Sequence, residues 1–227
     1  MDYNTYVATI QNLMAVATNP VDPNFTQILP SIITSAEQRI YRDLDLISTV
    51  VTDATTSAQI GIPIINIPGA FVVVQNMNAI DSSGFKTPIT PTGRALIDTS
   101  YSDQTMTGRP TYFAMITQNS MALGPIPDAP YSIEVIGTQR PATLSATNTT
   151  TFISVNLPDL FINASMIFAS GYMRNFGAQA DNPQMATSWE SEYQLLFKAA
   201  NVEEMRKRFH SQAWSSEMPT PAAPVQG

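Results

Sequence analysis

The sequence predicts an α+β protein. Both chain ends form a helical bundle, an antiparallel β-sheet or barrel domain is inserted between them, and the C-terminus is an extended tail. Apolar residues recur at helical spacing in residues 1–45 and 146–210. Short β-branched runs between Gly and Pro occupy residues 46–145, and residues 211–227 are rich in Pro, Ser and Ala. These four segments are the expected parts of the protein.

The first 45 residues predict two helices. Residues 2–18 carry apolar side chains at steps of three and four, and Asn19-Pro20 is expected to end this helix because proline disfavours helical backbone in the preceding residue. The second helix is expected to start near Asp22-Pro23 or Pro30 and to run to about Asp45. Its apolar residues lie on one face: Ile28, Leu29, Ile32, Ile33, Ala36, Ile40 and Leu44. The two helices can pair as a hairpin.

The middle of the chain predicts a sheet. The candidate strands are residues 46–53, 60–67, 70–78, 87–90, 110–117, 120–124 and 131–138. Pro68-Gly69 and Gln118-Asn119 are each expected to form a tight turn between two strands. The strand spacing is typical of a small antiparallel sheet or barrel. Residues 92–108 are expected to be a long loop.

Helical periodicity returns after a connector rich in Thr, Asn and Ser at residues 144–156. A helix is expected to open at Leu157-Pro158-Asp159 and to end near Phe176-Gly177. Asp181-Asn182-Pro183 then predicts the start of a final helix, because proline is favoured in a first helical turn. That helix is expected to run to about Phe209.

The composition argues against several classes of function. Charged residues make up 13% of the chain, about half the roughly 25% of an average globular protein, while hydrophobic residues make up 44%. Much of the polar surface is therefore uncharged, as in proteins that pack against other subunits. The formal net charge of −7 argues against a protein whose affinity depends on neutralising phosphates. With no long apolar run and no basic start at Met1, we expect a soluble protein made in the cytoplasm, without a membrane partner.

Few residues are available for catalysis or cofactor binding. The chain has no Cys and a single His, His210, which excludes thiolate chemistry and a multi-His zinc site within one chain. Asp43 and Asp45 close a helix without a neighbour that would separate their pKa values. Glu190 and Glu192 differ by two positions, so a solvated helix face is the better interpretation of both. We expect no catalytic residue, no cofactor and no metal.

The last predicted helix ends in a reversal of charge. Glu203-Glu204-Met205-Arg206-Lys207-Arg208 is either a solvated helix end or a patch that faces an acidic partner. His210 follows at the helix C-terminus, where a cation complements the helix dipole. Trp214 lies in the Pro/Ser-rich tail, where it has no core to enter. It is either an anchor for a partner's pocket or a solvated residue of a terminus.

Three stretches of the chain carry further motifs. Residues 29–45 contain Ala36-Glu37 and the following Arg39. The middle stretch contains Gly108-Arg109-Pro110-Thr111-Tyr112-Phe113, residues 121–127 with Pro125-Ile126-Pro127, Tyr131-Ser132-Ile133-Glu134-Val135, and Arg140-Pro141 followed by Leu144-Ser145. The third stretch is Leu157–Ser165. In this order they resemble the second helix, the β insertion and the re-entering bundle helix of the head-to-tail adaptor (connector) proteins of tailed bacteriophages, especially short-tailed phages.

The resemblance implies a structural virion protein at the head–tail interface, assembled in the host cytoplasm and without catalysis. It implies a dodecameric ring that joins the portal to the tail tube or nozzle and lets DNA pass without specific binding. Such a closed ring needs heterologous contacts between its copies. We expect two sets of partner-binding residues. Arg206, Lys207, Arg208, Phe209, Trp214 and Met218 are expected to bind the portal, and Tyr101, Arg109 and Tyr112 the tail component.

Two alternatives stay open. A tail-associated cell-wall hydrolase or carbohydrate-binding module would need two facing carboxylates or an exposed aromatic platform in the β part. The candidates for that site are Asp98, Asp103, Tyr101 and Tyr112. Another neck or tail completion protein of the same particle would differ from an adaptor in its location rather than in its physics.

Overall fold

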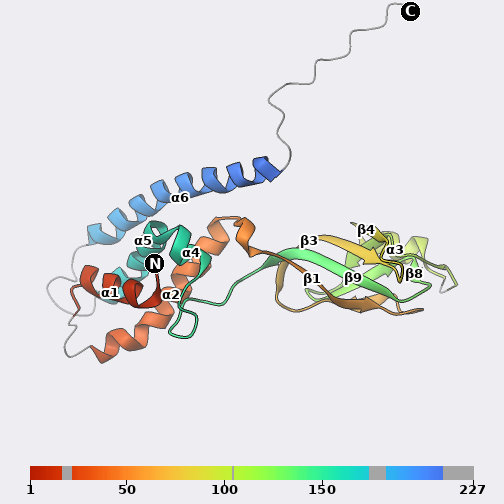
Figure 1. Ribbon diagram of the computed structural model, residues 1–227, viewed down its shortest axis with the longest axis horizontal. Helices are drawn as coiled ribbons and strands as arrows, with labels where there is room; N and C mark the ends of the chain where they lie inside the picture. The colour runs from red at the N-terminus through yellow and green to blue at the C-terminus, as the bar shows by residue number, and fades with distance from the viewer. Residues whose placement is uncertain (17–21, 104, 174–182, 212–227) are drawn as a thin grey trace, which may run out of the picture. The chain divides into compact units, whose positions relative to one another are not determined.

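The chain forms two compact units in the computed structural model, which describes residues 1–16, 22–103, 105–173 and 183–211 (Figure 1). The helical unit comprises Met1–Ile47 and Ala142–Gly227, and the β unit comprises Ser48–Pro141. The described chain is therefore α+β, as predicted.

Five helices make up the described part of the helical unit. They are α1 (Tyr3–Leu13), α2 (Pro23–Asp43), α4 (Phe152–Asn156), α5 (Pro158–Met173) and α6 (Pro183–Ser211). Asp22 caps α2 by accepting a hydrogen bond from the Asn24 N–H at 2.8 Å, so α2 starts at Pro23 and contains Pro30. Helix α1 is shorter than the predicted 2–18. Its end precedes Ala15, whose φ of 52° is in the left-handed region that interrupts a helix.

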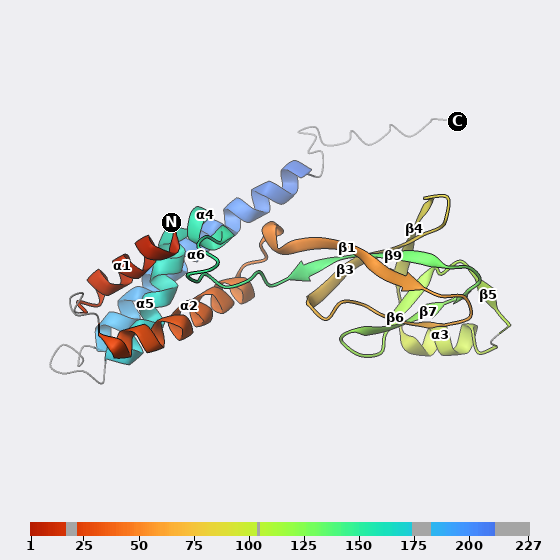
Figure 2. The same cartoon turned by 60° about the horizontal axis from the view of Figure 1, so that its bottom comes forward.

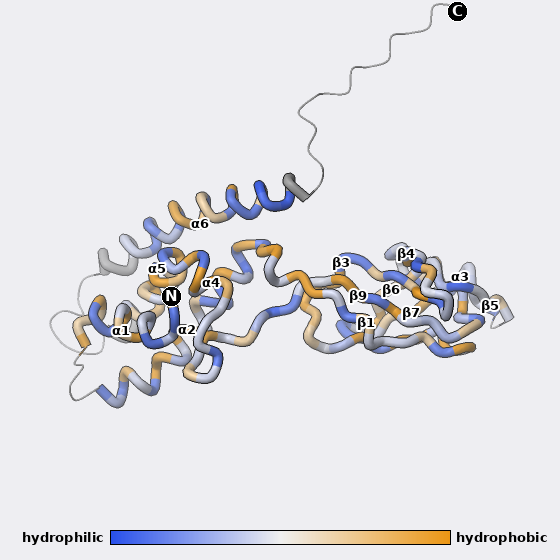
Figure 3. The backbone as a smooth tube through the Cα atoms, viewed as in Figure 1, coloured by the Kyte–Doolittle hydropathy of each residue, from blue (hydrophilic) through white to orange (hydrophobic). Residues whose placement is uncertain are grey.

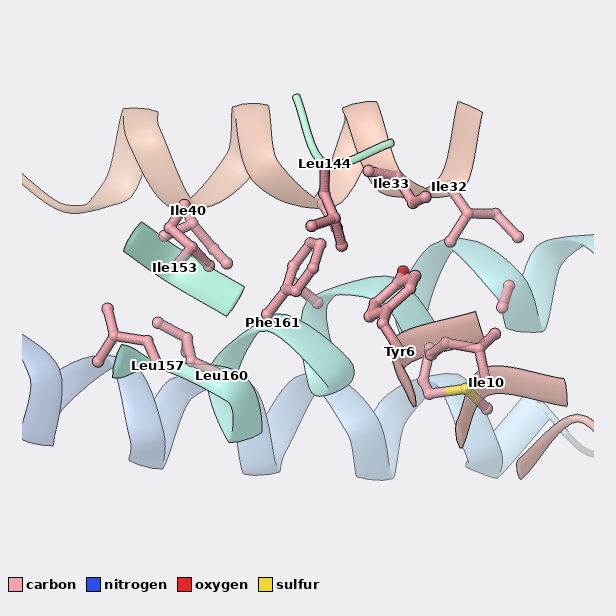
Figure 4. Close-up of a cluster of buried hydrophobic side chains, with 14 of the residues drawn as sticks. Tyr6, Ile10, Ile32, Ile33, Ile40, Leu144, Ile153, Leu157, Leu160 and Phe161 are labelled. Carbon is pink, nitrogen blue, oxygen red and sulfur yellow. The ribbon is translucent and has the colours of Figure 1, made fainter. Parts of the chain in front are cut away.

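One apolar core is shared by these helices (Figure 4). The ring of Tyr6 from α1 stacks on that of Phe161 from α5 with centroids 4.7 Å apart, and the Tyr6 hydroxyl donates to Ser165 at 2.7 Å. Helix α6 adds Tyr193 and Ala200. The rest of the labelled cluster comes from α1, α2, residues 144–157 and α5: Ile10, Ile32, Ile33, Ile40, Leu144, Ile153, Leu157 and Leu160. Segments far apart in the sequence therefore depend on one another for burial.

The connector predicted over residues 144–156 is wrong in part, because Phe152–Asn156 forms α4. Thr151 and Ser154 form a reciprocal capping box that starts this helix, with hydrogen bonds of 2.9 and 3.2 Å. Helix α5 begins at Pro158 as predicted. The predicted helix end at Phe176-Gly177 lies outside the described residues.

The β unit contains a seven-stranded sheet with the order β1-β9-β3-β4-β6-β7-β2. Its strands are β1 (Val50–Ala58), β2 (Ile64–Asn66), β3 (Phe71–Ile80), β4 (Lys86–Pro91), β6 (Tyr112–Met115), β7 (Ser120–Gly124) and β9 (Tyr131–Gln139). The end strands β1 and β2 also contact each other, so the sheet is nearly closed. A short separate pair joins β5 (Thr107–Gly108) to β8 (Ile126–Pro127).

The alternation of β9 shows how the sheet is packed. Tyr131, Ile133 and Val135 are buried, while Ser132 and Glu134 between them are half-buried. Strand β9 pairs with β1 on one side and β3 on the other, both antiparallel. Its odd-numbered side chains therefore enter the core of the β unit, as period-two patterning requires.

Two of the β predictions need correction. The sheet is not wholly antiparallel, because β4 pairs with β6 in parallel, as β5 does with β8. The predicted loop over residues 92–108 contains α3 (Arg94–Ser100) as well as β5. Helix α3 lies between β4 and β6 in the chain, and it packs Ile97 against Ala114 and Ala122. Such a crossover brings the second strand back in the same direction as the first.

One of the two predicted turns is confirmed, and the first predicted strand is shifted. The β6–β7 hairpin around Gln118-Asn119 is confirmed by the Ile116 N–H bond to Ser120 O at 2.9 Å. Pro68-Gly69 lies between β2 and β3 in the chain, but these two strands are not paired with each other. Instead, β2 pairs with β7, and β3 pairs with β9 and β4. The first strand is shifted toward the C-terminus from the predicted 46–53, because Ile47–Thr49 forms a 3-10 turn.

The register of β1 and β9 defines two ends of the β unit (Figure 2). Val50 pairs with Thr138 at the end where the chain enters and leaves the unit, and Ala58 pairs with Tyr131 at the other end. We call this other end the distal end. It carries the loops of residues 59–63, 81–85 and 128–130, which follow or precede paired strand ends.

Candidate functional site

The Ala36-Glu37 pair of the adaptor-like motif faces the core of the helical unit. Glu37 is fully buried and accepts hydrogen bonds from the Leu144 N–H at 3.2 Å and from the Thr151 hydroxyl at 3.3 Å. Burial raises the pKa of Glu37 from 4.5 to about 7, although both hydrogen bonds oppose this change. The carboxyl group therefore joins α2 to the segment that returns from the β unit.

Arg39 of the same motif joins α2 to α6. Its guanidinium donates to both carboxylate oxygens of Glu190, at 2.8 and 2.6 Å, and its central carbon lies 4.1 Å from the centre of the Tyr193 ring. The Tyr193 hydroxyl donates to Asp43 at 2.7 Å. The predicted solvated face is therefore wrong for Glu190, whose carboxylate is paired with Arg39, while Glu192 is exposed. Asp43 also has the Arg39 Nε atom at 3.5 Å. The hydrogen bonds from Arg39 lower the pKa of Glu190 and keep it ionised.

The charge reversal at the end of α6 is compensated within the helical unit. Hydrophilic residues gather in these last turns (Figure 3). Lys207 Nζ lies 2.7 Å from Glu204 and 3.0 Å from Glu203, and its hydrogen bond to Glu204 raises its pKa. Arg208 lies 2.5 Å from the Asp45 carboxylate. Two of the candidate portal-binding cations therefore fix the end of α6, while Arg206 is exposed.

The remaining candidates for portal binding belong to the last turn of α6 or follow it in the sequence. Phe209 and His210 belong to α6 by their backbone. Their side chains, together with Trp214 and Met218, lie outside what the structure describes. The portal assignment of Phe209, Trp214 and Met218 stays a prediction.

Arg109, a candidate for tail binding, is engaged inside the β unit. It donates to Asp81 and, at 2.9 Å, to the Thr87 hydroxyl, and its guanidinium carbon lies 5.1 Å from the centre of the Phe85 ring. Asp81 also accepts from the N–H groups of Ser83 and Phe85, at 2.9 and 3.0 Å. Arg109 therefore holds the β3–β4 turn in place, and this turn presents Phe85.

Tyr101 lines a pocket of about 360 Å³ beside α3. The apolar lining includes Ile97, Ala122, Leu123 and Ile126, and the polar lining includes Arg94, Asp98 and Ser102. The Tyr101 ring covers Gly124, where a Cβ would come within 2.7 Å of it. Tyr112 is the register partner of Gly124 and is exposed, and it is not among the lining residues.

The two carboxylates of the hydrolase alternative do not form a catalytic pair. Asp98 pairs with Arg94 at 3.4 Å and lines the pocket, whereas Asp103 is not among the lining residues. Asp103 accepts from the Thr105 N–H at 2.9 Å, and hydrogen bonds from Thr105 lower its pKa. A glycosidase acid requires a raised pKa. Among the residues that the structure describes, no cluster of His, Asp and Glu could hold a metal ion.

The sequence reasoning missed the exposed apolar residues at the distal end. Ile60 is 64% exposed, Ile62 is 46% exposed and Phe85 is 62% exposed. Gly61 and Gly84 beside them have φ of 73° and 84°. Apolar residues next to a turn glycine are a signal that could have found this surface, because such turns project their neighbours into solvent.

Comparison with known proteins identifies the family. The family model described as SU10 adaptor protein matches residues 1–220, which include all of the β unit and most of the helical unit. A search of curated proteins finds no significant match. None of the described helices combines the length and apolarity that a bilayer span requires. The match confirms the resemblance to phage adaptors that the motifs at residues 29–45, 108–141 and 157–165 indicated. The chain therefore belongs to the SU10 adaptor protein family of structural phage proteins.

Proposed function

We propose that the protein is a head-to-tail adaptor whose copies form a dodecameric ring between the portal and the tail tube or nozzle. The observation that carries this proposal is the family match over residues 1–220. In the proposal the ring is assembled in the host cytoplasm, belongs to the virion, and leaves a central path through which DNA passes without specific binding. The role is mechanical, and no catalytic step is part of it.

The helical unit is the proposed ring-forming part, with α1, α2, α5 and α6 acting as one bundle. Its shared core and the Arg39–Glu190 pair make it a single rigid partner for assembly. The low charge content of the chain, 13%, supports subunit packing because few charges must be desolvated at the contacts. A closed ring then repeats one heterologous contact.

The portal contact is assigned to the end of α6 and the residues that follow it. Lys207 and Arg208 hold this helix end through Glu204 and Asp45. Arg206 and Phe209 then lie next to the tail, in which Trp214 and Met218 are the apolar anchors. Aromatic residues that enter a partner's pocket commonly contribute most of the binding energy.

Removing residues 211–227 is expected to abolish portal binding while the fold stays intact. Light scattering should show that the full chain joins purified portal rings in stoichiometric number and that the shortened chain does not. Trp214→Ala is expected to weaken binding at least tenfold, as for a hot-spot residue, and Val225→Ala serves as the matched control in the same tail. Equal binding of the shortened chain would contradict the portal assignment, and a full chain that ignores the portal would contradict the proposed function.

The tail contact is assigned to the distal end of the β unit. Ile60, Ile62 and Phe85 supply exposed apolar loops there, and Arg109 positions the turn that carries Phe85. Tyr101 lines the neighbouring pocket beside Ile126, and Tyr112 is exposed nearby on β6. Apolar loop tips suit a concave protein partner better than DNA, which attracts cations.

Phe85→Ser is expected to reduce binding to the tail component at least tenfold, because an exposed aromatic side chain at the centre of a contact acts as an anchor. Binding to portal rings should be unchanged. Val73→Ser is the control, since Val73 is also exposed but pairs with Thr138 at the opposite end of the sheet. Pull-down of the tail component by preassembled rings of each variant measures this binding. Equal losses of tail binding in the Phe85→Ser and Val73→Ser variants would refute the assignment.

A further inference from the structure

Helix α6 is apolar on two opposite faces. Its inner face contributes the buried Tyr193 and Ala200 to the core of the helical unit. On the outer face Leu195 is 63% exposed, Val202 is 47% exposed and Met205 is 50% exposed. These three residues follow one another at steps of seven and three, which aligns them along one side of the helix. A lone surface helix would have a polar outer face.

The outer face cannot be buried by a rotation of α6, because polar contacts fix the inner face along the helix. Glu190 is held by Arg39, at 2.6 Å, and the Tyr193 hydroxyl donates to Asp43 at 2.7 Å. Near the other end the buried Glu204 accepts the Ile47 N–H at 3.2 Å. The exposed apolar row is therefore a permanent feature of the helical unit.

The charges on the outer face are all positive. Lys198 lies three positions after Leu195, and Arg206 lies four positions after Val202, so both cations are on the same side of the helix as the apolar row. Both are exposed. Within the described residues neither cation forms an ion pair. Glu192 and Glu203 fall beside this stripe rather than on it, by the 100° step of the helix. The outer face is therefore apolar with a positive fringe, in a chain whose net charge is −7.

We propose that this outer face of α6, formed by Leu195, Lys198, Val202 and Met205, is the surface through which one copy packs against the helical unit of the next copy. The inference rests on the proposed ring and names the surface that closes it. A second copy of this acidic chain is complementary in charge to Lys198. Because ring contacts are heterologous, the face meets a different surface of the neighbour rather than another α6 outer face.

A nucleic acid is the weaker occupant of this face. Binding to the phosphate backbone of DNA needs clustered cations, whereas Lys198 and Arg206 are separated by large apolar side chains. DNA would form no favourable contact with these apolar side chains. Apolar rows with few charges are typical of the buried centre of protein contacts. A copy of this chain therefore fits this face better than a nucleic acid does.

The test combines surface variants with portal-templated assembly. The double variant Leu195→Ser, Val202→Ser is expected to bind portal rings without cooperativity, with at least a tenfold increase in the concentration for half-saturation. Leu13→Ser is the matched control, because Leu13 is an exposed leucine on α1. Lys198→Glu is expected to weaken assembly at low salt more than at high salt, since screening reduces charge complementarity. Circular dichroism should be unchanged in all of these variants.

A site-specific cross-link identifies the occupant. The chain has no Cys, so Val202→Cys carries a single benzophenone maleimide in assemblies of the full chain with portal and DNA. We expect cross-links to helical-unit residues of a second copy other than residue 202. Cross-links to portal or to DNA, or assembly of the double variant equal to wild type, would overturn the inference while leaving the adaptor function intact. A wild-type chain that never joins the portal would overturn the proposed function, and the inference with it.

Discussion

Gly137→Ala is expected to destabilise the β unit by about 3 kcal/mol, the upper part of the range for overpacking a core. A Cβ at this position would lie 2.3 Å from the Val73 carbonyl oxygen and 2.9 Å from Phe71 Cδ1. Neither neighbour can move freely, because β9 pairs on both sides, with β1 and β3. The clash must therefore be relieved by breaking ladder hydrogen bonds or displacing the buried Phe71.

The two units make this effect separable. Neither tryptophan lies in the β unit, and Trp189 packs against the core of the helical unit, so tryptophan fluorescence follows the helical unit in urea. Far-ultraviolet circular dichroism follows both units. We expect a new early transition in circular dichroism with little change in the fluorescence midpoint. Gly93→Ala is the control, because a Cβ at Gly93 meets nothing within 4 Å. Identical unfolding curves for the two variants would contradict the steric explanation.

Glu37→Gln is expected to remove most of the pH dependence of the helical unit between pH 4.5 and 7. The folded protein binds the Glu37 proton more tightly than the unfolded chain, because the pKa rises from 4.5 to about 7 on burial. This stabilising contribution is complete below pH 4.5 and is lost as the pH rises through 7. The loss is about 3 kcal/mol, at about 1.4 kcal/mol for each pKa unit.

Urea unfolding followed by tryptophan fluorescence at pH 5 and pH 8 measures this difference. Glutamine keeps an oxygen that can accept from Leu144 and Thr151 but carries no charge to desolvate. Wild type should therefore lose more stability between the two pH values than Glu37→Gln does. Glu192→Gln, an exposed change on α6, should behave as wild type. A Glu37→Gln protein with the pH dependence of wild type would show that the buried carboxyl is not the cause.

Elements with strong local signals could be predicted from the sequence. The cap and proline at Asp22-Pro23 start α2, and the alternation of β9 marks its buried face. Turn residues fix the β6–β7 hairpin. Helix α3 was missed because its seven residues, Arg94–Ser100, are too few for a clear helical period. Its presence changed the β4–β6 pairing from antiparallel to parallel.

The candidate site was predicted only in part. Arg109 and Tyr101 are predicted to bind the tail component, yet in the structure Arg109 holds the β3–β4 turn and Tyr101 covers Gly124. The exposed residues Ile60 and Phe85 are not among the predicted binding residues, because an isolated apolar residue beside a turn has the same pattern as the end of a strand. Exposure depends on which loops the register brings to the same end of the sheet.

From the chain alone one can recognise the order of helical and β segments, the low charge content and the resemblance to adaptors that the family match confirms. These follow from period, caps and composition, which are properties of neighbouring residues. By contrast, the pairing of Arg39 with Glu190, 151 positions away, and the burial of Glu37 against Leu144 are apparent only in the folded protein. The same holds for the second apolar face of α6. Such pairings depend on the packing of whole elements, whose free energy is a sum over many distant contacts and has no local pattern in the chain.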